Sequence, residues 1–312
     1  IEHGARSRSG RFFNFNGTAG IWRRTAIADA GGWQHDTITE DMDLSYRAQL
    51  AGWKFIYAPL TSAPAELPSE MNGFKGQQYR WAKGSVQTAR KLLGRIFEAE
   101  VSWEVKAEAF FHLSNNFAYV FLLLLAALQL PNMLIRRHLE RPELLMLDVP
   151  LFLATCGSIA AFYLVAHRDL YGRRWRALAQ LPAMMALGIG LSINNGRAAI
   201  EGLLGHDVEF VRTPKRGDPV VNGPRYRARW SWHNMLELGF GLYCTASLLI
   251  AILTRSWASV PFLLLFCAGF SWVAAASLRE ALGARLAAQG EPGLAAQAPS
   301  THSSPSPQSM LS

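Results

Sequence analysis

The chain has 312 residues; half of them are hydrophobic and only 17% are charged, a balance that disfavours a simple soluble protein. A net charge of +8 is compatible with nucleic-acid binding, but the basic residues lie beside apolar runs of membrane length, so nucleic acid is not expected as a partner. The three cysteines lie in apolar segments, at spacings that fit neither a metal site nor a disulfide framework.

Residues 1–70 alternate short elements in a way that is typical of an α/β domain. In chain order we expect a strand at Phe12–Phe15, a turn at Asn16–Gly20, a short helix at Arg24–Ala30, a longer helix at Thr37–Ala51 capped by Gly52, and a strand at Trp53–Tyr57. The chain opens on Ile1, in mid-domain sequence without a signal-peptide pattern. We therefore expect a fragment that carries the C-terminal part of such a domain.

Residues 71–109 are expected to form amphipathic helices at a membrane surface. From Met71 to Ile96 an apolar stripe opposes a polar face that has six basic and no acidic residues. Such a face suits a helix that lies in a membrane interface. An ordinary surface helix is the alternative. In either case, a break in the helix would be expected at Gly84.

Residues 110–280 contain four apolar runs that are long enough to span a bilayer, which takes about 20 residues. These runs are Phe111–Leu134, Val149–His167, Met235–Leu253 and Trp257–Leu278. A fifth run, Leu178–Ile193, is shorter, contains proline and glycine, and lies between two basic loops, Arg168–Arg176 and Arg197–Arg229. Because both loops should face the cytoplasm, we expect this run to be interfacial or re-entrant. Residues 281–312 form a tail that is rich in Pro, Ser, Ala and Gln, which predicts disorder.

The motif Thr39-Glu40-Asp41 lies where the longer helix begins. The segment from Thr37 to Glu40 fits a capping box, and acids in a first helical turn suit the helix dipole, so capping explains much of the pattern. A carboxylate at a helix start can also act as a general base that deprotonates an attacking sugar hydroxyl. The two roles are compatible if Glu40 caps the helix and Asp41 points into a cleft.

The motif Gln77-Gln78-Tyr79-Arg80-Trp81 places an amide, a guanidinium and an indole on one helix face, because Gln77, Arg80 and Trp81 have the spacing i, i+3, i+4. A guanidinium can bind a diphosphate through forked hydrogen bonds. An indole offers a flat apolar platform for a sugar ring. The competing interpretation is a Trp that packs on the core while Arg and Gln are solvated.

Two further segments carry weaker signals. In the turn after Phe15, glycines let the backbone approach a ligand, and Asn16 and Thr18 could bind hydroxyls, although a strand-end turn explains the pattern equally well. The segment from Phe210 to Lys215 lies in a basic loop between membrane segments. A loop held in the cytoplasm by its charge explains it without any ligand.

The order of these motifs resembles that of the family 2 inverting glycosyltransferases. Cellulose synthase, hyaluronan synthase, chitin synthase and the cellulose-synthase-like mannan synthases share a turn with Asn-Gly-Thr, then Thr-Glu-Asp, then Gln-x-x-Arg-Trp, then membrane helices. The segments FNGTAG, TEDMDLSYRAQLAGW, QQYRWAKGS and FVRTPK are most similar to bacterial cellulose-synthase-like proteins of the glucomannan 4-β-mannosyltransferase type. The resemblance implies the C-terminal part of a GT-A type α/β nucleotide-sugar transferase domain, followed by an α-helical polytopic membrane region.

The resemblance also implies a role for each motif. Asp41 would be the catalytic base. The acceptor site would be lined by Phe15, Asn16, Gly17, Thr18 and Trp81. The donor diphosphate would be held by Glu40, Gln77 and Arg80. A gating loop within residues 205–232 would carry Phe210, Thr213 and Lys215.

The family binds Mg²⁺ or Mn²⁺ at an Asp-x-Asp motif, and here the chain departs from the pattern. Its one Asp-x-Asp is Asp41-Met42-Asp43, which overlaps the base motif. No metal ligand is therefore assigned in this chain. The ligands are expected upstream of Ile1, and this chain alone is expected to be inactive.

The expected reaction transfers a hexose with inversion from a nucleotide sugar, GDP-mannose or UDP-glucose, to a growing β-glycan, coupled to export of the polymer across the lipid bilayer. The expected location is the bacterial inner membrane, with the catalytic part in the cytoplasm; an export partner protein is left open. Two alternatives stand beside this reading. One is a glucosyltransferase that makes another β-glucan. The other is a non-catalytic channel or transport subunit, which would not need the Thr-Glu-Asp and Gln-x-x-Arg-Trp motifs.

Overall fold

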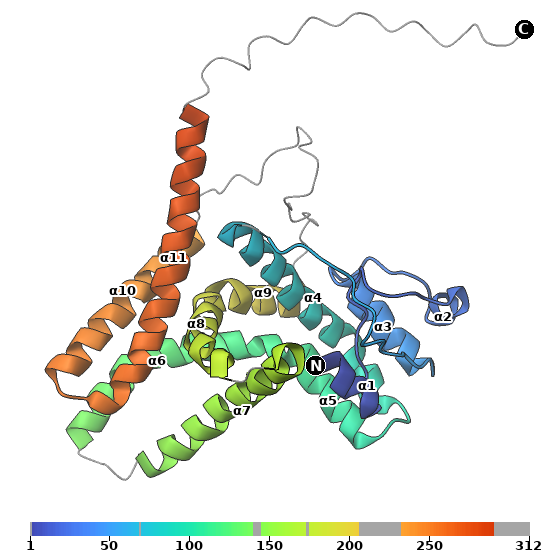
Figure 1. Ribbon diagram of the computed structural model, residues 1–312, viewed down its shortest axis with the longest axis horizontal. Helices are drawn as coiled ribbons and strands as arrows, with labels where there is room; N and C mark the ends of the chain where they lie inside the picture. Colours follow the sequence, from blue (N-terminus) through green and yellow to red (C-terminus); the bar gives the residue numbers. More distant parts are fainter. Residues whose placement is uncertain (1, 69, 140–144, 173–174, 206–231, 290–312) are drawn as a thin grey trace, which may run out of the picture.

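The computed structural model describes residues 2–68, 70–139, 145–172, 175–205 and 232–289 (Figure 1). Regular structure within these ranges is helical. The α-helices are α1 (Glu2–Arg8), α2 (Arg24–Asp29), α3 (Glu40–Leu50), α4 (Met71–Glu98), α5 (Trp103–Ser114), α6 (Ala118–Leu139), α7 (Leu145–Tyr171), α8 (Trp175–Gly190), α9 (Ser192–Leu204), α10 (Trp232–Leu253) and α11 (Val260–Gln289). Short 3₁₀ turns, η1 (Asn115–Phe117) and η3 (Trp257–Ser259), precede α6 and α11. The expected gating-loop residues Phe210, Thr213 and Lys215, and residues 290–312 of the tail, lie outside the described residues.

The two expected strands are absent from the described residues, so the α/β prediction is not confirmed there. A strand needs a neighbouring strand to pair its backbone groups. Around Phe13, side chains of α3 take that place. The Phe13 N–H donates to Gln49 Oε1 at 3.2 Å, Gln49 Nε2 donates to the Phe13 carbonyl at 2.9 Å, and the Phe15 N–H donates to Ser45 Oγ at 2.8 Å. In the segment Trp53–Tyr57, Trp53 and Phe55 pack against a core cluster, and no strand among the described residues pairs with it.

The two helices expected within residues 1–70 are confirmed, but the second one begins later than expected. Residues Arg24–Asp29 form α2 as expected, and α3 is followed by Gly52 in the left-handed conformation, with φ of 90°. However, α3 begins at Glu40 rather than Thr37, and Thr39 at its N-cap makes no side-chain capping bond. The hydroxyls of Thr37 and Thr39 are buried without a hydrogen-bond partner. The capping-box prediction is therefore wrong.

Helix α4 runs without a break through Gly84 and spans 28 residues. Its apolar stripe is buried in a core cluster that it shares with α3 and α5: Tyr46, Ala89, Leu92, Ile96, Ala109 and Leu113. Three of its cations are bound by acids of other elements, because Lys75 pairs with Glu237, Lys83 with Glu201, and Lys91 with Asp36 and Asp43. The interfacial location of α4 stays a prediction.

Among the residues that the structure describes, three helices are long and apolar enough to cross a membrane: Trp103–Leu139, Trp232–Leu253 and Trp257–Gly283. They contain three of the four expected spans. The remaining one, Val149–His167, is helical within α7 but is not among the three. The segment Leu178–Ile193, expected to be interfacial or re-entrant, lies in α8 and α9. These two helices are bent by 48° relative to each other and form either a broken span or a re-entrant loop. Residues 197–204, expected to start a basic loop, are helical in α9.

Helix α4 lies between the N-terminal residues 1–70 and the apolar helices of the C-terminal part. It contacts α3 and α5 on one side and α9 and α11 on the other, as Figure 1 shows, with α10 and α11 packed side by side beyond. The helices α6, α8, α9, α10 and α11 share a second core of Ala126, Ile189, Ile193, Cys244, Phe266 and Phe270. Helix α4, which carries the Gln-x-x-Arg-Trp motif, therefore packs both against α3, which carries Asp41, and against the apolar helices.

Candidate functional site

Asp41 lies in the first turn of α3, half-buried, beside the exposed Glu40. Its Oδ1 accepts a hydrogen bond from the Met42 N–H at 2.8 Å. Burial raises the pKa of the Asp41 carboxyl, and the neighbouring charge of Glu40 raises it further, although the Met42 N–H opposes both. A carboxylate with a raised pKa is a stronger base than an ordinary aspartate, which suits proton abstraction from a hydroxyl.

The turn that follows Phe15 lies against this carboxylate. Gly17 has a φ of 75°, and a Cβ built on it would lie 3.1 Å from Asp41 Oδ2. Ser45 ties the two together, because its Oγ accepts from the Phe15 N–H at 2.8 Å and donates to the Asp41 carbonyl at 2.6 Å. Glycine therefore leaves the turn close to the carboxylate, and the neighbouring Asn16 and Thr18 are exposed there.

The start of α3 is held against one face of α4. A Cβ on Gly84 would lie 2.4 Å from both Cγ2 and Oγ1 of Thr39, so only glycine allows this approach. The Ile38 N–H donates to Gln87 Oε1 at 3.0 Å, and Lys91 Nζ lies 2.7 Å from Asp36 Oδ1. Positions 84, 87 and 91 follow one stripe of α4.

The same stripe carries the Gln-x-x-Arg-Trp motif. Arg80 and Trp81 lie one helical turn before Gly84, and Gln77 lies one turn earlier. Trp81 is 53% exposed, whereas Gln77 and Arg80 are half-buried. Because Gly84 contacts Thr39, two residues from Asp41, the structure brings the two motifs to adjacent turns of neighbouring helices. The exposed indole can serve as a stacking platform there.

Asp43 does not form a metal-binding pair with Asp41. Its side chain is fully buried and pairs with Arg47 at 2.7 Å and with Lys91 at 3.0 Å, while Arg47 also donates to the carbonyls of Ala30 and Gly32. Across the described ranges, no group of three or more His, Cys, Asp or Glu side chains could hold a metal ion. These residues therefore do not fit a Mg²⁺ or Mn²⁺ site.

Replacement of Asp43 by alanine should be strongly destabilising. It leaves Arg47 buried without its counter-charge, which costs about 3–5 kcal/mol in comparable buried pairs. Denaturant titration of the purified protein in lipid nanodiscs measures the loss in free energy of unfolding. Asp36→Ala is the matched control, since Asp36 binds the same Lys91 from an exposed position. Equal unfolding midpoints for the two variants would contradict the assignment.

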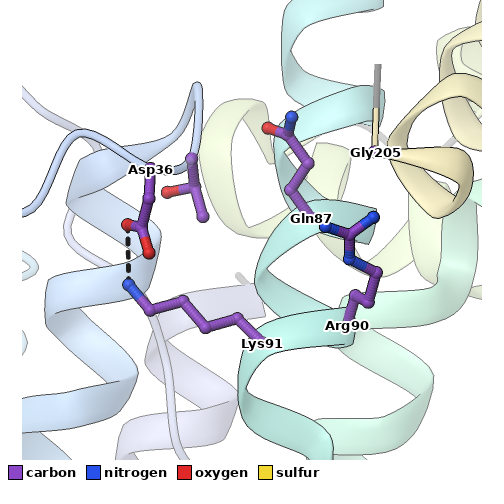
Figure 2. Close-up of a pocket in the computed structure, with 6 residues that line it drawn as sticks. Asp36, Gln87, Arg90, Lys91 and Gly205 are labelled. Carbon is purple, nitrogen blue, oxygen red and sulfur yellow. Dashed lines mark hydrogen bonds and ion pairs between the residues drawn. The ribbon is translucent and has the colours of Figure 1, made fainter. Parts of the chain in front are cut away.

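A cleft of about 280 Å³ lies further along α4, beyond the contact with Thr39 (Figure 2). The Asp36 carboxylate, on one wall, binds Lys91; burial alone would raise its pKa, but the hydrogen bond and charge of Lys91 lower it overall. Opposite, Arg90 donates to the Leu203 carbonyl at 3.2 Å. The lining residues are Asp36, Thr37, Gln87, Arg90, Lys91 and Gly205. This ion pair therefore lines the cleft, and none of the predicted site residues is among the lining residues.

Sequence reasoning missed a set of acids that bind the far face of α4. Tyr79 donates to Glu201, which also lies 2.5 Å from Arg197 Nε and 3.6 Å from Lys83 Nζ. Glu237 and Glu280, on α10 and α11, bind the first two turns of α4. The signal was present, since a carboxylate within an apolar helix is costly and needs a partner. The partner itself could not be read from the local pattern.

Known proteins similar to this chain are glycosyltransferases. The family described as "Glycosyl transferase family group 2" matches residues 3–167, just over half of the chain. Glucomannan 4-beta-mannosyltransferase 7 of Arabidopsis thaliana is 33% identical over 258 residues, which cover 78% of this chain and 43% of that protein. Glucomannan 4-beta-mannosyltransferase 1 of Oryza sativa subsp. japonica is 47% identical over 96 residues, 31% of this chain and 18% of that protein.

The chain spans less than half the length of the two curated relatives described above. No solved structure matches it. The family match over residues 3–167 and the mannosyltransferase relatives together place the chain among the glycosyltransferases.

Proposed function

The chain belongs to glycosyl transferase family group 2, and on that premise we propose that it carries the base and acceptor half of a hexosyltransferase site that elongates a β-glycan. The observation that carries the proposal is the position of the Asp41 carboxylate. It lies against the Gly17 turn, and its helix start contacts α4 one turn from Trp81. Family kinship favours such an enzyme over a non-catalytic channel.

In the proposed reaction, Asp41 takes the proton from the acceptor hydroxyl as that oxygen attacks the anomeric carbon of the donor. The new glycosidic C–O bond forms while the bond from the same carbon to the diphosphate breaks, so the configuration inverts. The nucleoside diphosphate leaves with the electron pair. Gln77 and Arg80 hold the diphosphate through hydrogen bonds and charge. Glu40, at the start of α3, is the third residue that we assign to the donor side. Phe15, Asn16, Gly17 and Thr18 line the acceptor side.

For the donor we propose GDP-mannose first and UDP-glucose second, because the relatives are named for mannosyl transfer into glucomannan. Three helices that could cross a bilayer support a membrane location, and export of the product through it. The bacterial inner membrane, with the site in the cytoplasm and Phe210, Thr213 and Lys215 in a gating loop, remains part of the proposal. It rests on the sequence resemblance and on the basic loops.

The donor can be tested in membranes that contain the full-length gene product. Each nucleotide sugar is supplied in radiolabelled form, and the product is digested separately with a β-mannanase and a β-glucanase. We expect label from GDP-mannose in a polymer that the mannanase degrades. Incorporation from UDP-glucose alone, into a glucanase-sensitive polymer, would support the second donor. No polymer from either sugar would contradict the function.

Loss of the indole at position 81 should weaken acceptor use. We expect Trp81→Ala to lower elongation about tenfold, since stacking of a sugar ring on an aromatic platform is lost while the exposed position keeps the fold intact. Initial rates over a series of acceptor concentrations measure the change, which should fall on the acceptor KM. Trp103→Ala removes another exposed indole, 70% exposed at the start of α5, and should elongate normally. Equal elongation by both variants would exclude the stacking role.

A further inference from the structure

The first turn of α4 receives its hydrogen-bond acceptor from a helix far away in the sequence. Glu280, on α11, accepts from the backbone N–H of Met71 and, at 2.9 Å, from that of Asn72, which lies 208 residues earlier. It also accepts from the Asn72 side-chain amide at 2.7 Å. Glu70, which precedes the helix, makes no side-chain capping bond. Helix N-termini leave N–H groups without partners, so here a neighbouring helix supplies the cap.

A second acid fixes the next turn. Lys75 pairs with Glu237 of α10 and donates to Ser277 Oγ of α11 at 3.3 Å. All three side chains are buried: Lys75 is 7% exposed, and Glu237 and Ser277 are 0% exposed. Asn194 of α9 adds a hydrogen bond from its side-chain amide to the Lys75 carbonyl at 2.9 Å. Three helices thus hold the same turn of α4.

Breaking these contacts would cost enough free energy to keep α4 in one position. Glu237 is the one Asp, Glu, Lys or Arg residue of the 22-residue helix α10. A carboxylate in such a helix is expensive unless it is paired. Separation of the pair would leave Lys75 and Glu237 as uncompensated buried charges, so the first two turns of α4 cannot slide or tilt freely against α10 and α11.

We propose that Glu280 and Glu237 are positioning residues that set the place of Gln77 and Arg80 in the site; this inference rests on the proposed function. Gln77 lies two residues beyond Lys75 and five beyond Asn72 on the same rigid helix. A shift of the helix start therefore moves the diphosphate-binding face by a similar amount. Neither acid touches substrate. Each acts through the backbone or the lysine of α4.

The test uses the full-length protein in lipid nanodiscs. We expect Glu280→Ala to lower kcat/KM for the nucleotide sugar about tenfold, with a raised KM, because misplacement of a binding group by about 1 Å can cost even more. Arg279→Ala, at the exposed preceding position of α11, is the matched control and should behave as the wild type. If Glu280→Ala proves too unstable to purify, Glu280→Gln keeps one acceptor oxygen and should show a smaller change in the same direction.

A second substitution separates positioning from simple capping. Serine is a good N-cap, so Glu70→Ser in the Glu280→Ala background gives α4 a local cap without its link to α11. We expect the double variant to recover its unfolding temperature but not its KM. Recovery of both would mean that Glu280 only stabilises the helix, which would overturn the inference. So would a Glu280→Ala variant with wild-type KM and kcat.

Hydrogen exchange gives a reading that does not depend on activity. In the Glu280→Ala variant, backbone amides of residues 71–80 should exchange faster than in the wild type and in Arg279→Ala. Unchanged exchange would contradict the contact itself. A wild type that makes no polymer would count against the proposed function. A failure of the positioning role, in contrast, would leave wild-type synthesis intact and appear only in the variants.

Discussion

Asp41→Asn in the full-length protein is expected to reduce polymer synthesis about a thousandfold, the usual range for loss of a general base being 10²–10⁴-fold. Asparagine keeps the size of the side chain, so the contact with the Gly17 turn and the start of α3 should persist. Only the ability to accept the hydroxyl proton is lost. Initial rates with saturating donor measure the effect, which should fall on kcat.

The pH dependence provides an independent check on the same residue. Because burial raises the pKa of Asp41 above its ordinary value of 3.8, the base becomes protonated at a higher pH than an exposed aspartate would. Wild-type kcat/KM should therefore fall as the pH drops through that raised pKa and level off above it. Asp29→Asn, an exposed acid on α2, should keep the wild-type rate and profile. Normal synthesis by Asp41→Asn would remove Asp41 from the mechanism.

Gly84→Ala is the second variant with a large expected effect. The added methyl group would lie 2.4 Å from Thr39 Cγ2, well inside van der Waals contact, so the start of α3 has to move away from α4. Such overpacking costs about 1–3 kcal/mol. The displacement also separates Asp41 from the face that carries Trp81, so we expect synthesis to fall at least about tenfold.

The control for this variant lies on the same helix. A Cβ on Gly94 would meet nothing within 4 Å, so Gly94→Ala introduces the same methyl group in open space. It should leave synthesis unchanged and stabilise α4 by about 1 kcal/mol, the difference in helix propensity. Unfolding midpoints and synthesis rates of the two variants are compared in the same membranes. Equal behaviour would mean that the packing of Gly84 on Thr39 does not hold the two motifs together.

Local patterns predicted those elements whose causes are local. The helix α2 with its closing glycines, the end of α3 at Gly52 and the apolar stripe of α4 all follow from residues close in the sequence. Three long apolar helices follow from composition alone. The roles of Asp41 and of the Gln-x-x-Arg-Trp face came from the resemblance. Neither motif is specific by spacing, since capping and amphipathic packing produce the same patterns.

What failed depended on distant partners. The aromatic run at Phe12–Phe15 has the composition of a strand, but Gln49 and Ser45 bind its backbone in place of a second strand. The capping box failed because α3 begins only at Glu40, and the side chain of its N-cap residue Thr39 packs against Gly84 and makes no capping bond. The partners of Lys75 and Asn72 are 162 and 208 residues away, a separation that no window of local sequence reveals.

The cap that α11 provides for α4 also has a consequence in time. A ribosome that adds about 5–20 residues per second completes Asn72 roughly 10–40 s before Glu280. During that interval the amides of the first turn of α4 lack Glu280 as an acceptor and are left to water. The turn that precedes Gln77 thus gains its acceptor only after α11 has been synthesised and packed. If Gln77 and Arg80 bind the donor diphosphate as proposed, a nascent chain arrested before that point is expected to bind the nucleotide sugar weakly.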